Sequence, residues 1–351
     1  MISGSCLKPT LLRRQFMASI AGEPWYIPAL RTAKPMRTVT EAEVLALIKE
    51  NRSFVLTAHV SPDGDSLGSL LALYEFLTSQ GKQVTIVLDD ILPPVYRILP
   101  HWEAIRSVDE VGRINADLLI ILDASTADRI GRVGEIVHAP TLNIDHHVSN
   151  RGFTDHRWLD ADAAATGELI YRLIEKAKAS LTKEMAINLY TAIATDCGFF
   201  RYANTKPATM RIGAELLAHG AEPNVIAEAL ETVSMNTMRL TVRALQTMAF
   251  FAEGKIAIIT VTKDMLANDE STDELIAYPR KIEGVDVAVM LKQRDDSSVK
   301  VSMRSRTVDV SQVALQFGGG GHARAAGCSI EGSIEEAREK LLAVILPKVG
   351  E

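Results

Sequence analysis

A repeated alternation of short apolar runs with helical patterns constrains the fold of this chain more than any other feature. Between Met36 and about residue 205, the runs SFVLTAH, KQVTIVLDD, DLLIILD and TLNID have the length and composition of strands. The segment SLLALYEFLTSQ has the spacing of an amphipathic helix, and Gly81 after it is placed to end that helix. Strands that alternate with helices are typical of an α/β domain built on a parallel sheet.

Three of these runs end on histidine or aspartate. SFVLTA leads into His59, DLLIILD ends at Asp123, and TLNID ends at Asp145, which is followed by His146 and His147. In open α/β sheets, ligands bind beyond the carboxyl ends of the strands. We therefore expect these side chains to meet at one edge of the sheet.

The residue types at this edge point to metal ions. His59 is followed by Asp63 and Asp65, a spacing that lets one turn supply ligands to two neighbouring cations, with Asp123 as a bridge between them. Carboxylate and imidazole without thiolate favour a divalent ion such as manganese, with magnesium and cobalt as alternatives. An Asp-Gly-Asp after proline is more often a surface turn, and a His-His pair is common by chance. The metal site is predicted because both motifs occur together at the ends of expected strands.

A further ligand is predicted at Asp196. It is the only carboxylate of the largely apolar helical segment AINLYTAIATDCGFF. A buried charge needs a partner, and a metal ion would be one. The alternative is a helix end at which Asp196 meets solvent before Gly198. The neighbouring ligands favour the metal, whereas Cys197 is expected to be a small buried residue.

Composition and charge limit the function. The 351 residues are 47% hydrophobic and 23% charged, which suits two globular domains, and the net charge of −6 argues against a broad surface for long duplex DNA. The three cysteines form no CxxC pair, which favours a reducing cytoplasm. No apolar run approaches the ~20 residues of a membrane helix.

The chain is expected to divide into four parts. Residues 1–35 read as an N-terminal tail or a mis-assigned start, because KPTLLRRQFMASIAG lacks the apolar centre of a secretory signal and Met36 opens a plausible first helix. Residues 36–232 form the metal-binding domain, 233–252 a connecting helix, and 253–351 a substrate-binding domain.

The C-terminal domain is predicted to offer a cationic surface. GKIAIITV, VDVAVMLKQ and SVKVSMRSR read as strands, and DDSS joins the last two as a hairpin. Period two places Lys300, Ser302, Arg304 and Arg306 on one face. The alternative is a merely solvated face. FGGGGHARAAG favours a phosphate-binding loop over a flexible linker, through Gly319, Gly320, Gly321, His322 and Arg324.

Together these motifs resemble a known family. HVSPDGD, LDAS, NIDHH and TDCGFF, followed by GGGGHARAAG, are similar to the DHH phosphoesterase family with its DHH-associated C-terminal domain, over roughly residues 36–347. In its length and motif spacing, the chain most resembles members of this family that are both oligoribonucleases and phosphoadenosine phosphate phosphatases. The resemblance implies a parallel-sheet N-terminal domain and a smaller C-terminal α/β domain with a central sheet, with the active site in the cleft between them.

The resemblance also implies roles for the residues. One metal ion would be held by His59, Asp63 and Asp123, and the other by Asp65, Asp123, His146 and Asp196. His147 would face the substrate phosphate, and Asp145 would orient a histidine by a hydrogen bond. Two such ions would activate water for attack on phosphorus, so that no protein nucleophile is needed.

The predicted function is hydrolysis of short RNA oligonucleotides and of 3'-phosphoadenosine 5'-phosphate by a cytoplasmic enzyme. The sequence does not decide between a monomer and a homodimer. Alternatives are a phosphodiesterase for cyclic or linear dinucleotides, a RecJ-like single-strand exonuclease, a family II pyrophosphatase and a non-enzymatic nucleotide sensor. The net charge argues against a DNA channel, and the GGGGH motif argues against a pyrophosphatase. A sensor would be expected to have lost metal ligands, and all six are present.

Overall fold

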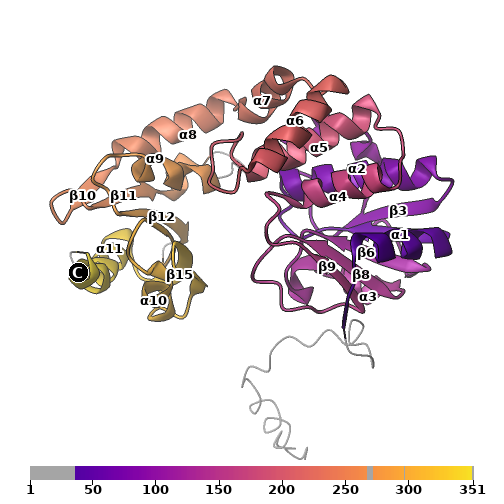
Figure 1. The fold of residues 1–351 in the computed structure, drawn as a ribbon. Helices are drawn as coiled ribbons and strands as arrows, with labels where there is room; N and C mark the ends of the chain where they lie inside the picture. Colours follow the sequence, from indigo (N-terminus) through magenta and orange to yellow (C-terminus); the bar gives the residue numbers. More distant parts are fainter. Residues whose placement is uncertain (1–35, 267–271, 296, 350–351) are drawn as a thin grey trace, which may run out of the picture. The chain divides into compact units, whose positions relative to one another are not determined.

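The computed structural model describes residues 36–266, 272–295 and 297–349, so the expectation for residues 1–35 lies outside the described residues. The described chain divides into two compact units, and the division falls between Glu231 and Thr232 (Figure 1). The prediction that the active site lies in a cleft between two domains stays a prediction.

The first unit is built on a seven-stranded sheet of order β1-β9-β8-β6-β2-β3-β4, in which every pairing is parallel. Strands β2, β6 and β8, which carry the predicted site, are therefore consecutive neighbours. The strands are β1 (Arg37–Thr38), β2 (Ser53–Thr57), β3 (Gln83–Leu88), β4 (Ile105–Ser107), β6 (Leu118–Leu122), β8 (Thr141–Asp145) and β9 (His156–Leu159). A separate small sheet pairs β5 (Ile114–Asn115) with β7 (Val137–His138).

Both faces of the central strands are buried, which explains their continuous apolar sequences. In β6, Leu118, Ile120 and Leu122 pack into one core cluster, while Leu119 and Ile121 pack into another on the opposite face. The first cluster is formed with the helices α1 (Glu41–Glu50), α2 (Gly64–Ser79), α4 (Thr166–Lys176), α5 (Lys183–Asp196), α6 (Pro207–Ala218) and α7 (Pro223–Glu231). The second cluster includes the short helix α3 (Val133–Ile136).

Helix α2 begins earlier than the sequence suggested. Asp63 is its N-cap and accepts a hydrogen bond from the backbone N–H of Ser66, so Asp65 lies in the first helical turn and not in a loop. The carboxylate cap outweighs the turn signal of Pro-Asp-Gly-Asp because it satisfies N–H groups that lack a partner at a helix start. At the other end, Gly81 has φ +73°, which is the left-handed conformation expected after a helix.

The second unit has a mixed six-stranded sheet of order β10-β11-β12-β13-β15-β14, in which β11 and β12 are parallel and the other pairs antiparallel. Its elements are α8 (Met235–Gln246), β10 (Ala249–Phe251), β11 (Ile256–Val261), α9 (Ala277–Arg280), β12 (Val287–Asp295), β13 (Ser298–Ser305), α10 (Val310–Leu315), β14 (Gly320–His322), β15 (Ala325–Glu331) and α11 (Ile334–Ile345). The predicted α/β fold class, with a parallel sheet followed by a second sheet, is confirmed.

The connecting helix predicted over residues 233–252 is too long. Helix α8 ends at Gln246, and residues 249–251 form β10, which pairs with β11. Short 3₁₀ helices lie at Pro94–Ile98, Trp102–Ala104, Ala127–Ile130, Lys263–Met265, Asp273–Ile276 and Leu346–Lys348.

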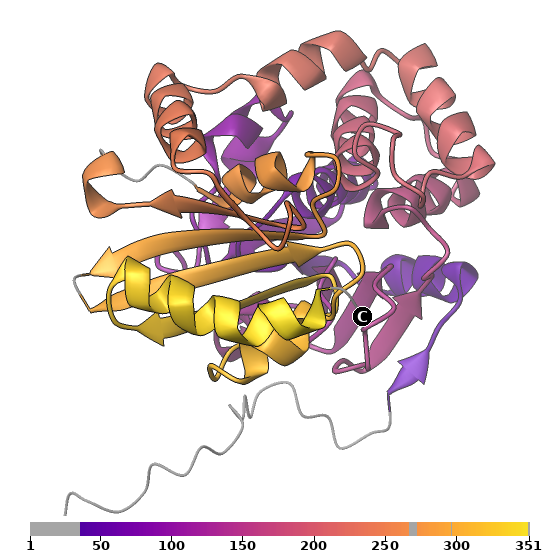
Figure 2. The same ribbon diagram turned by 90° about the vertical axis from the view of Figure 1, so that its left-hand side faces the viewer.

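Helices cover the two faces of the second sheet unequally. Residues of α10 and α11 share a core cluster with β11, β12, β13 and β15, and Figure 2 shows α11 lying along the sheet. On the other face, the cluster that includes Leu240 of α8 takes in residues of β11 and β12. On that face of β13, Lys300 is exposed and Arg304 is half-buried.

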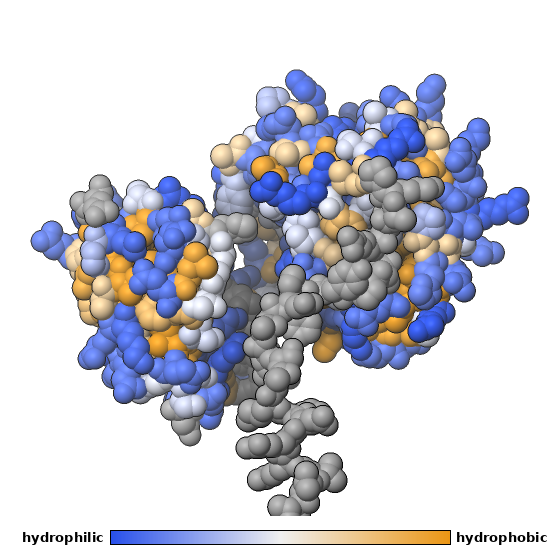
Figure 3. Space-filling model, turned by 90° about the horizontal axis from the view of Figure 1, so that it is seen from below, coloured by the Kyte–Doolittle hydropathy of each residue, from blue (hydrophilic) through white to orange (hydrophobic). Residues whose placement is uncertain are grey.

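Hydrophobic and hydrophilic side chains are interspersed on the face of each unit drawn in Figure 3. Among the described residues, no helix is both long enough and apolar enough to cross a bilayer.

A tight crossing of α2 and α5 supports the site. A Cβ added at Gly68 of α2 would lie 2.3 Å from the backbone oxygen of Asn188 and 3.0 Å from the Cβ of Ala192, both in α5. Only glycine permits this approach of the two helices.

We predict that Gly68→Ala destabilises the protein by ~1–3 kcal/mol, because overpacking at the crossing outweighs the gain in helix propensity of ~1 kcal/mol. Urea denaturation followed by circular dichroism measures the change. Gly112→Ala is the matched control, since a Cβ at Gly112 meets no atom within 4 Å. Equal midpoints for Gly68→Ala and wild type would contradict the packing argument.

Candidate metal centre

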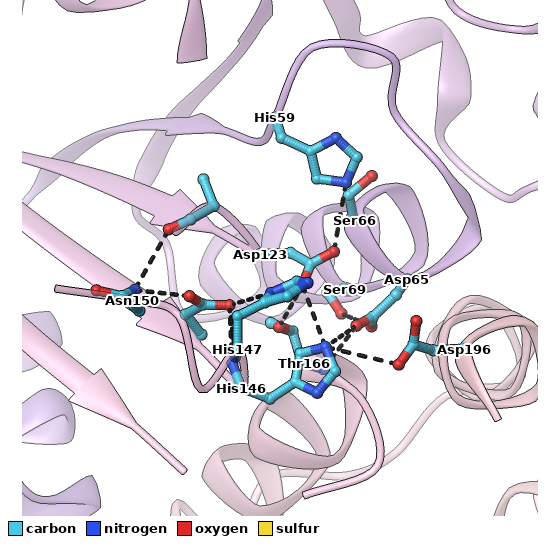
Figure 4. Close-up of polar contacts among 12 residues, drawn as sticks. His59, Asp65, Ser66, Ser69, Asp123, His146, His147, Asn150, Thr166 and Asp196 are labelled. Atoms are coloured by element: carbon cyan, nitrogen blue, oxygen red, sulfur yellow. Dashed lines mark hydrogen bonds and ion pairs between the residues drawn. The ribbon is translucent and has the colours of Figure 1, made fainter. Parts of the chain in front are cut away.

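The carboxyl ends of β2, β6 and β8 bring together residues that are far apart in the sequence. His59 lies two residues beyond the end of β2, Asp123 directly follows β6, and Asp145 ends β8 just before His146 and His147. Helix α2 adds Asp63 and Asp65, and α5 adds Asp196 as its last residue. All six predicted metal ligands therefore lie in one cluster, most of which is drawn in Figure 4.

Asp123 faces two groups of side chains that could hold a metal ion. Its Oδ2 is 3.5 Å from Nε2 of His59, and its Oδ1 is 3.6 Å from Nε2 of His146. Its backbone has φ +55°, a left-handed conformation that aspartate tolerates better than most residues. The strand end thus turns sharply, and each carboxylate oxygen faces a different histidine.

The first group consists of His59, Asp63 and Asp123, whose ligand atoms lie within 4.8 Å of one another. Nδ1 of His59 lies 2.8 Å from the carbonyl oxygen of Val60, so this nitrogen donates. Nε2 of the same ring lies 3.6 Å from Oδ1 of Asp63. A histidine held through one nitrogen by a backbone carbonyl has the other nitrogen oriented for a metal ion.

The second group consists of Asp65, His146 and Asp196. Nε2 of His146 is 3.7 Å from Oδ2 of Asp65 and 3.6 Å from Oδ2 of Asp196. This nitrogen is buried and makes no hydrogen bond with any described residue. Because buried polar atoms are nearly always partnered, a bare imidazole nitrogen facing two carboxylates fits a metal ion.

The charges in the cluster lead to the same conclusion. Burial and the charges of Asp123 and Asp196 raise the pKa of Asp65 well above its usual range, and burial raises the pKa of Asp196 to about 6. Burial alone would lower the pKa of His59, but Asp123 and Asp63 outweigh it and raise this pKa to about 10. The cluster holds more negative charge than its histidines neutralise, and a divalent cation would supply the difference.

The N-terminus of α4 fixes Asp65. Its Oδ2 accepts a hydrogen bond from the backbone N–H of Thr166 (2.7 Å), and its Oδ1 accepts from the N–H of Gly167 (2.9 Å) and the hydroxyl of Ser69 (3.0 Å). The hydroxyl of Thr166 also donates to Oδ1 of Asp123 at 3.0 Å. Thr166 therefore orients one carboxylate of the second group and also the carboxylate of Asp123, which faces histidines of both groups. Neither Thr166 nor Ser69 was predicted from the sequence.

A chain of buried amides holds His147. Burial alone would raise the pKa of Asp145, but hydrogen bonds from His147 and Asn150 lower it, so the carboxylate is ionised and accepts. Nδ1 of His147 donates to Oδ1 of Asp145 at 2.8 Å, and the Asn150 amide donates to Oδ2 at 2.6 Å. The same amide donates to Oδ1 of Asn143 at 2.6 Å.

The network decides which nitrogen of His147 is available. His147 could form a third ligand group with Asp123 and His146, but its Nδ1 is already bonded to Asp145. Nε2 is therefore the nitrogen that can contact a bound molecule. The hydrogen bond that His147 donates to Asp145 also raises the pKa of His147, to about 9. Neither Asn143 nor Asn150 was predicted from the sequence, although Asn150 in DHHVSN follows the histidines closely.

The second unit places two of its predicted residues, Arg304 and His322, in one row across the sheet. Arg304 of β13 pairs with Ala325 of β15, and Ala325 pairs with His322 of β14. Since neighbouring strands are ~4.8 Å apart, two strand spacings separate Arg304 from His322, with a small residue between them. Arg324 precedes β15 and is exposed. Lys300 and Ser302 share the face of Arg304, as period two predicted.

The glycine run differs from the predicted loop. Gly320–His322 forms the edge strand β14, paired with β15. A Cβ at Gly319 would lie 2.2 Å from the carbonyl oxygen of Gly327, and a Cβ at Gly321 would lie 2.5 Å from that of Ala325, whereas Gly320 has open space. Close packing against β15 therefore explains Gly319 and Gly321, whereas a Cβ at Gly318 or Gly320 would meet no atom within 4 Å.

Comparison with known proteins identifies the class. The model described as the DHH family, N-terminal domain, matches residues 53–193, and the DHHA1 domain model matches residues 253–350. A Thermus thermophilus protein named bifunctional oligoribonuclease and PAP phosphatase NrnA is 36% identical over 321 residues, which cover 91% of this chain and 95% of that protein. A Bacillus subtilis protein of the same name is 26% identical over 299 residues, covering 83% and 93%.

A solved structure agrees with these matches. The crystal structure of an exopolyphosphatase-related protein from Bacteroides fragilis has a TM-score of 0.81 and 28% identity, and the match covers 89% of this chain and 97% of that one. This chain belongs to the DHH family of phosphoesterases, which are metal-dependent hydrolases. The resemblance drawn from HVSPDGD, NIDHH and GGGGH is confirmed.

We predict that Thr166→Val weakens Mn²⁺ binding by about 10- to 100-fold, because loss of a hydrogen bond to a ligating carboxylate disturbs its orientation. Thr166→Ser keeps the hydroxyl and should bind as wild type does. Isothermal titration calorimetry measures the affinity. Thr191→Val is the control, since its buried hydroxyl bonds only within α5, to the carbonyl of Ile187. Equal affinities for Thr166→Val and Thr166→Ser would show that the hydroxyl does not position Asp123.

A second prediction concerns Asn150, which should act through Asp145 on His147. Asn150→Ala should lower kcat by about 10-fold or more with Mn²⁺ affinity retained. In a His147→Ala background the same substitution should change kcat less than about two-fold, because the group it orients is gone. The double-mutant cycle on one phosphodiester substrate measures this coupling. Additive losses would mean that Asn150 acts by stabilising the loop alone.

Proposed function

We propose that this chain hydrolyses short RNA oligonucleotides to mononucleotides and 3'-phosphoadenosine 5'-phosphate to AMP and phosphate. The observation that carries the proposal is Asp123, whose two oxygens face two separate groups of ligands. The names of the Thermus and Bacillus relatives, which match over most of their length, support the choice of substrates.

The ligand groups suggest how two metal ions would be held. His59, Asp63 and Asp123 would hold one, and Asp65, Asp123, His146 and Asp196 the other. Imidazole and carboxylate donors favour Mn²⁺, with Mg²⁺ or Co²⁺ as alternatives. When bound, such ions supply Lewis-acid activation of water and neutralise charge on the phosphate.

The protein's own residues have separate tasks. His147 is fixed through Nδ1 by Asp145, so its Nε2 would contact a phosphate oxygen or give a proton to the leaving oxygen. Thr166 and Ser69 keep the carboxylate of Asp65 in one orientation. No serine, threonine or cysteine nucleophile is required, because water attacks phosphorus.

The second unit would hold the substrate. At one end of β13, β14 and β15 lie Arg304, the backbone of Gly320, and the positions of His322 and Arg324. A phosphate would find a guanidinium and backbone N–H groups there. We assign residues 36–232 to catalysis, helix α8 to the connection and residues 253–351 to substrate binding. The lack of CxxC pairing supports a cytoplasmic enzyme.

Substrate length tests the proposal. Aromatic residues make up 5% of the chain and the net charge is −6, so affinity should not grow over a long strand. RNA of two to five nucleotides and phosphoadenosine phosphate should be cleaved far faster than strands of about twenty or more. The assay compares kcat/KM with Mn²⁺ across these lengths and includes pApA, cyclic di-AMP, pyrophosphate and single-stranded DNA.

Arg304→Ala should raise KM on every cleaved nucleotide with Mn²⁺ affinity unchanged. Arg338→Ala, which removes a positive charge from α11 on the opposite face of the same sheet, is its control. Rates that rise steadily with strand length would favour a processive exonuclease, and cleavage confined to cyclic di-AMP or pApA would favour a dinucleotide phosphodiesterase.

A further inference from the structure

A left-handed turn follows the ligand Asp196. Gly198, Phe199 and Phe200 have φ of +57°, +54° and +63° in succession. Phenylalanine rarely adopts this conformation, because its Cβ crowds the following carbonyl. Strained backbone persists only where its surroundings hold it, and it is concentrated at functional sites.

The turn is anchored on both sides. Phe199 and Phe200 pack against the core of the first unit, and the ring centroid of Phe200 lies 5.7 Å from that of Tyr190. The N–H groups of Arg201 and Tyr202 both donate to the carbonyl of Cys197, at 3.0 and 3.1 Å. Two aromatic side chains thus turn inward, and the two residues after them remain exposed.

Asn204 ties the same segment to the metal centre. Its amide nitrogen donates to the backbone carbonyl of Asp196 at 3.3 Å and to that of Ala164 at 3.0 Å. Ala164 lies two residues before Thr166, which bonds both Asp65 and Asp123. The position of the turn is therefore fixed relative to the ligands.

The ring of Tyr202 lies on Gly198. A Cβ added at this glycine would be 2.4–2.6 Å from Cζ, Cε1 and Cε2 of the ring, so no other residue permits the contact. Tyr202 nevertheless keeps 60% of its surface exposed. The guanidinium of Arg201 is held on the same glycine, since its Nε donates to the carbonyl oxygen of Gly198 at 2.7 Å.

An aromatic ring supported from beneath by backbone and open above is a surface on which a planar base can stack. Fixing the ring beforehand reduces the entropy that binding would otherwise cost. The acidic cluster beside the ring would repel a second phosphate, whereas it would not repel a neutral base. Single-stranded nucleic acids are commonly bound by bases that stack on tyrosine or on an arginine plane.

We propose that Tyr202 is a stacking platform for one nucleobase of the substrate, with Arg201 beside it. The inference rests on the proposed function and adds a base contact in the first unit to the phosphate contacts assigned to the second. It gives the enzyme a preference for nucleotides over phosphate esters that have no base.

The experiment compares Tyr202→Ala, Tyr202→Phe and Tyr202→Trp on 5'-phosphorylated diadenylate and on two analogues in which one adenine or the other is replaced by an abasic ribose. Tyr202→Ala should raise KM on diadenylate by about 5- to 100-fold with kcat changed less than about two-fold. The phenylalanine and tryptophan variants should stay near wild type, because they keep the ring.

The abasic substrates give the decisive comparison. On the analogue that lacks the stacked adenine, wild type should lose the same factor, and Tyr202→Ala should lose nothing further. Mn²⁺ affinity, measured by calorimetry, should be equal in all variants. Tyr278→Ala is the matched control, since it removes an exposed tyrosine from the second unit.

Three results would overturn the stacking role while leaving the proposed function intact: a wild-type KM for Tyr202→Ala on diadenylate, an equal loss for Tyr202→Phe, or an equal loss for Tyr202→Ala on both abasic analogues. A wild-type enzyme that cleaves neither dinucleotides nor phosphoadenosine phosphate would overturn the proposed function, and the stacking role with it.

Discussion

The first unit holds several carboxylates close together beside the ends of adjacent strands, and this crowding of negative charge is the constraint that the rest of the unit must satisfy. Like charges at this distance repel, and Asp65 is 1% exposed, so solvent cannot screen it. Three hydrogen bonds from Ser69, Thr166 and Gly167 hold its two oxygens. The parallel sheet, the start of α2 and the start of α4 are all needed to supply these partners, and the remaining excess of negative charge suits divalent cations.

Much of this site could be predicted from the sequence because strand ends have a simple geometry. His59, Asp123 and Asp145 directly follow or end apolar runs, and the order of a parallel sheet then places them on one edge. Asp196 was predicted because a lone carboxylate in an apolar helix needs a partner. These are local patterns, and the structure brings all of these residues to the cluster.

Other features were missed because they depend on contacts between distant segments. Thr166 is 101 positions from Asp65, and no local pattern joins them. The glycine run shows a different limit of prediction from sequence. A glycine can allow the close approach of a ligand or of a neighbouring strand, and the sequence does not distinguish the two cases. Gly319 and Gly321 are of the second kind, and Gly320 is not. The connecting helix was predicted too long because hydrophobic spacing alone did not show where pairing with β11 begins.

The crossing of α2 and α5 sets the distance between Asp65 and Asp196, two proposed metal ligands that come from different helices. Asp65 belongs to α2 and Asp196 to α5, and the helices touch at Gly64, whose Cβ would lie 2.4 Å from the hydroxyl oxygen of Thr195, and again at Gly68. Any residue larger than glycine at these positions would push the two helices apart. A side chain that touches neither carboxylate would then widen the spacing between Asp65 and Asp196. If the two carboxylates hold a cation as proposed, the wider site would favour larger ions without any change in the groups that bind them.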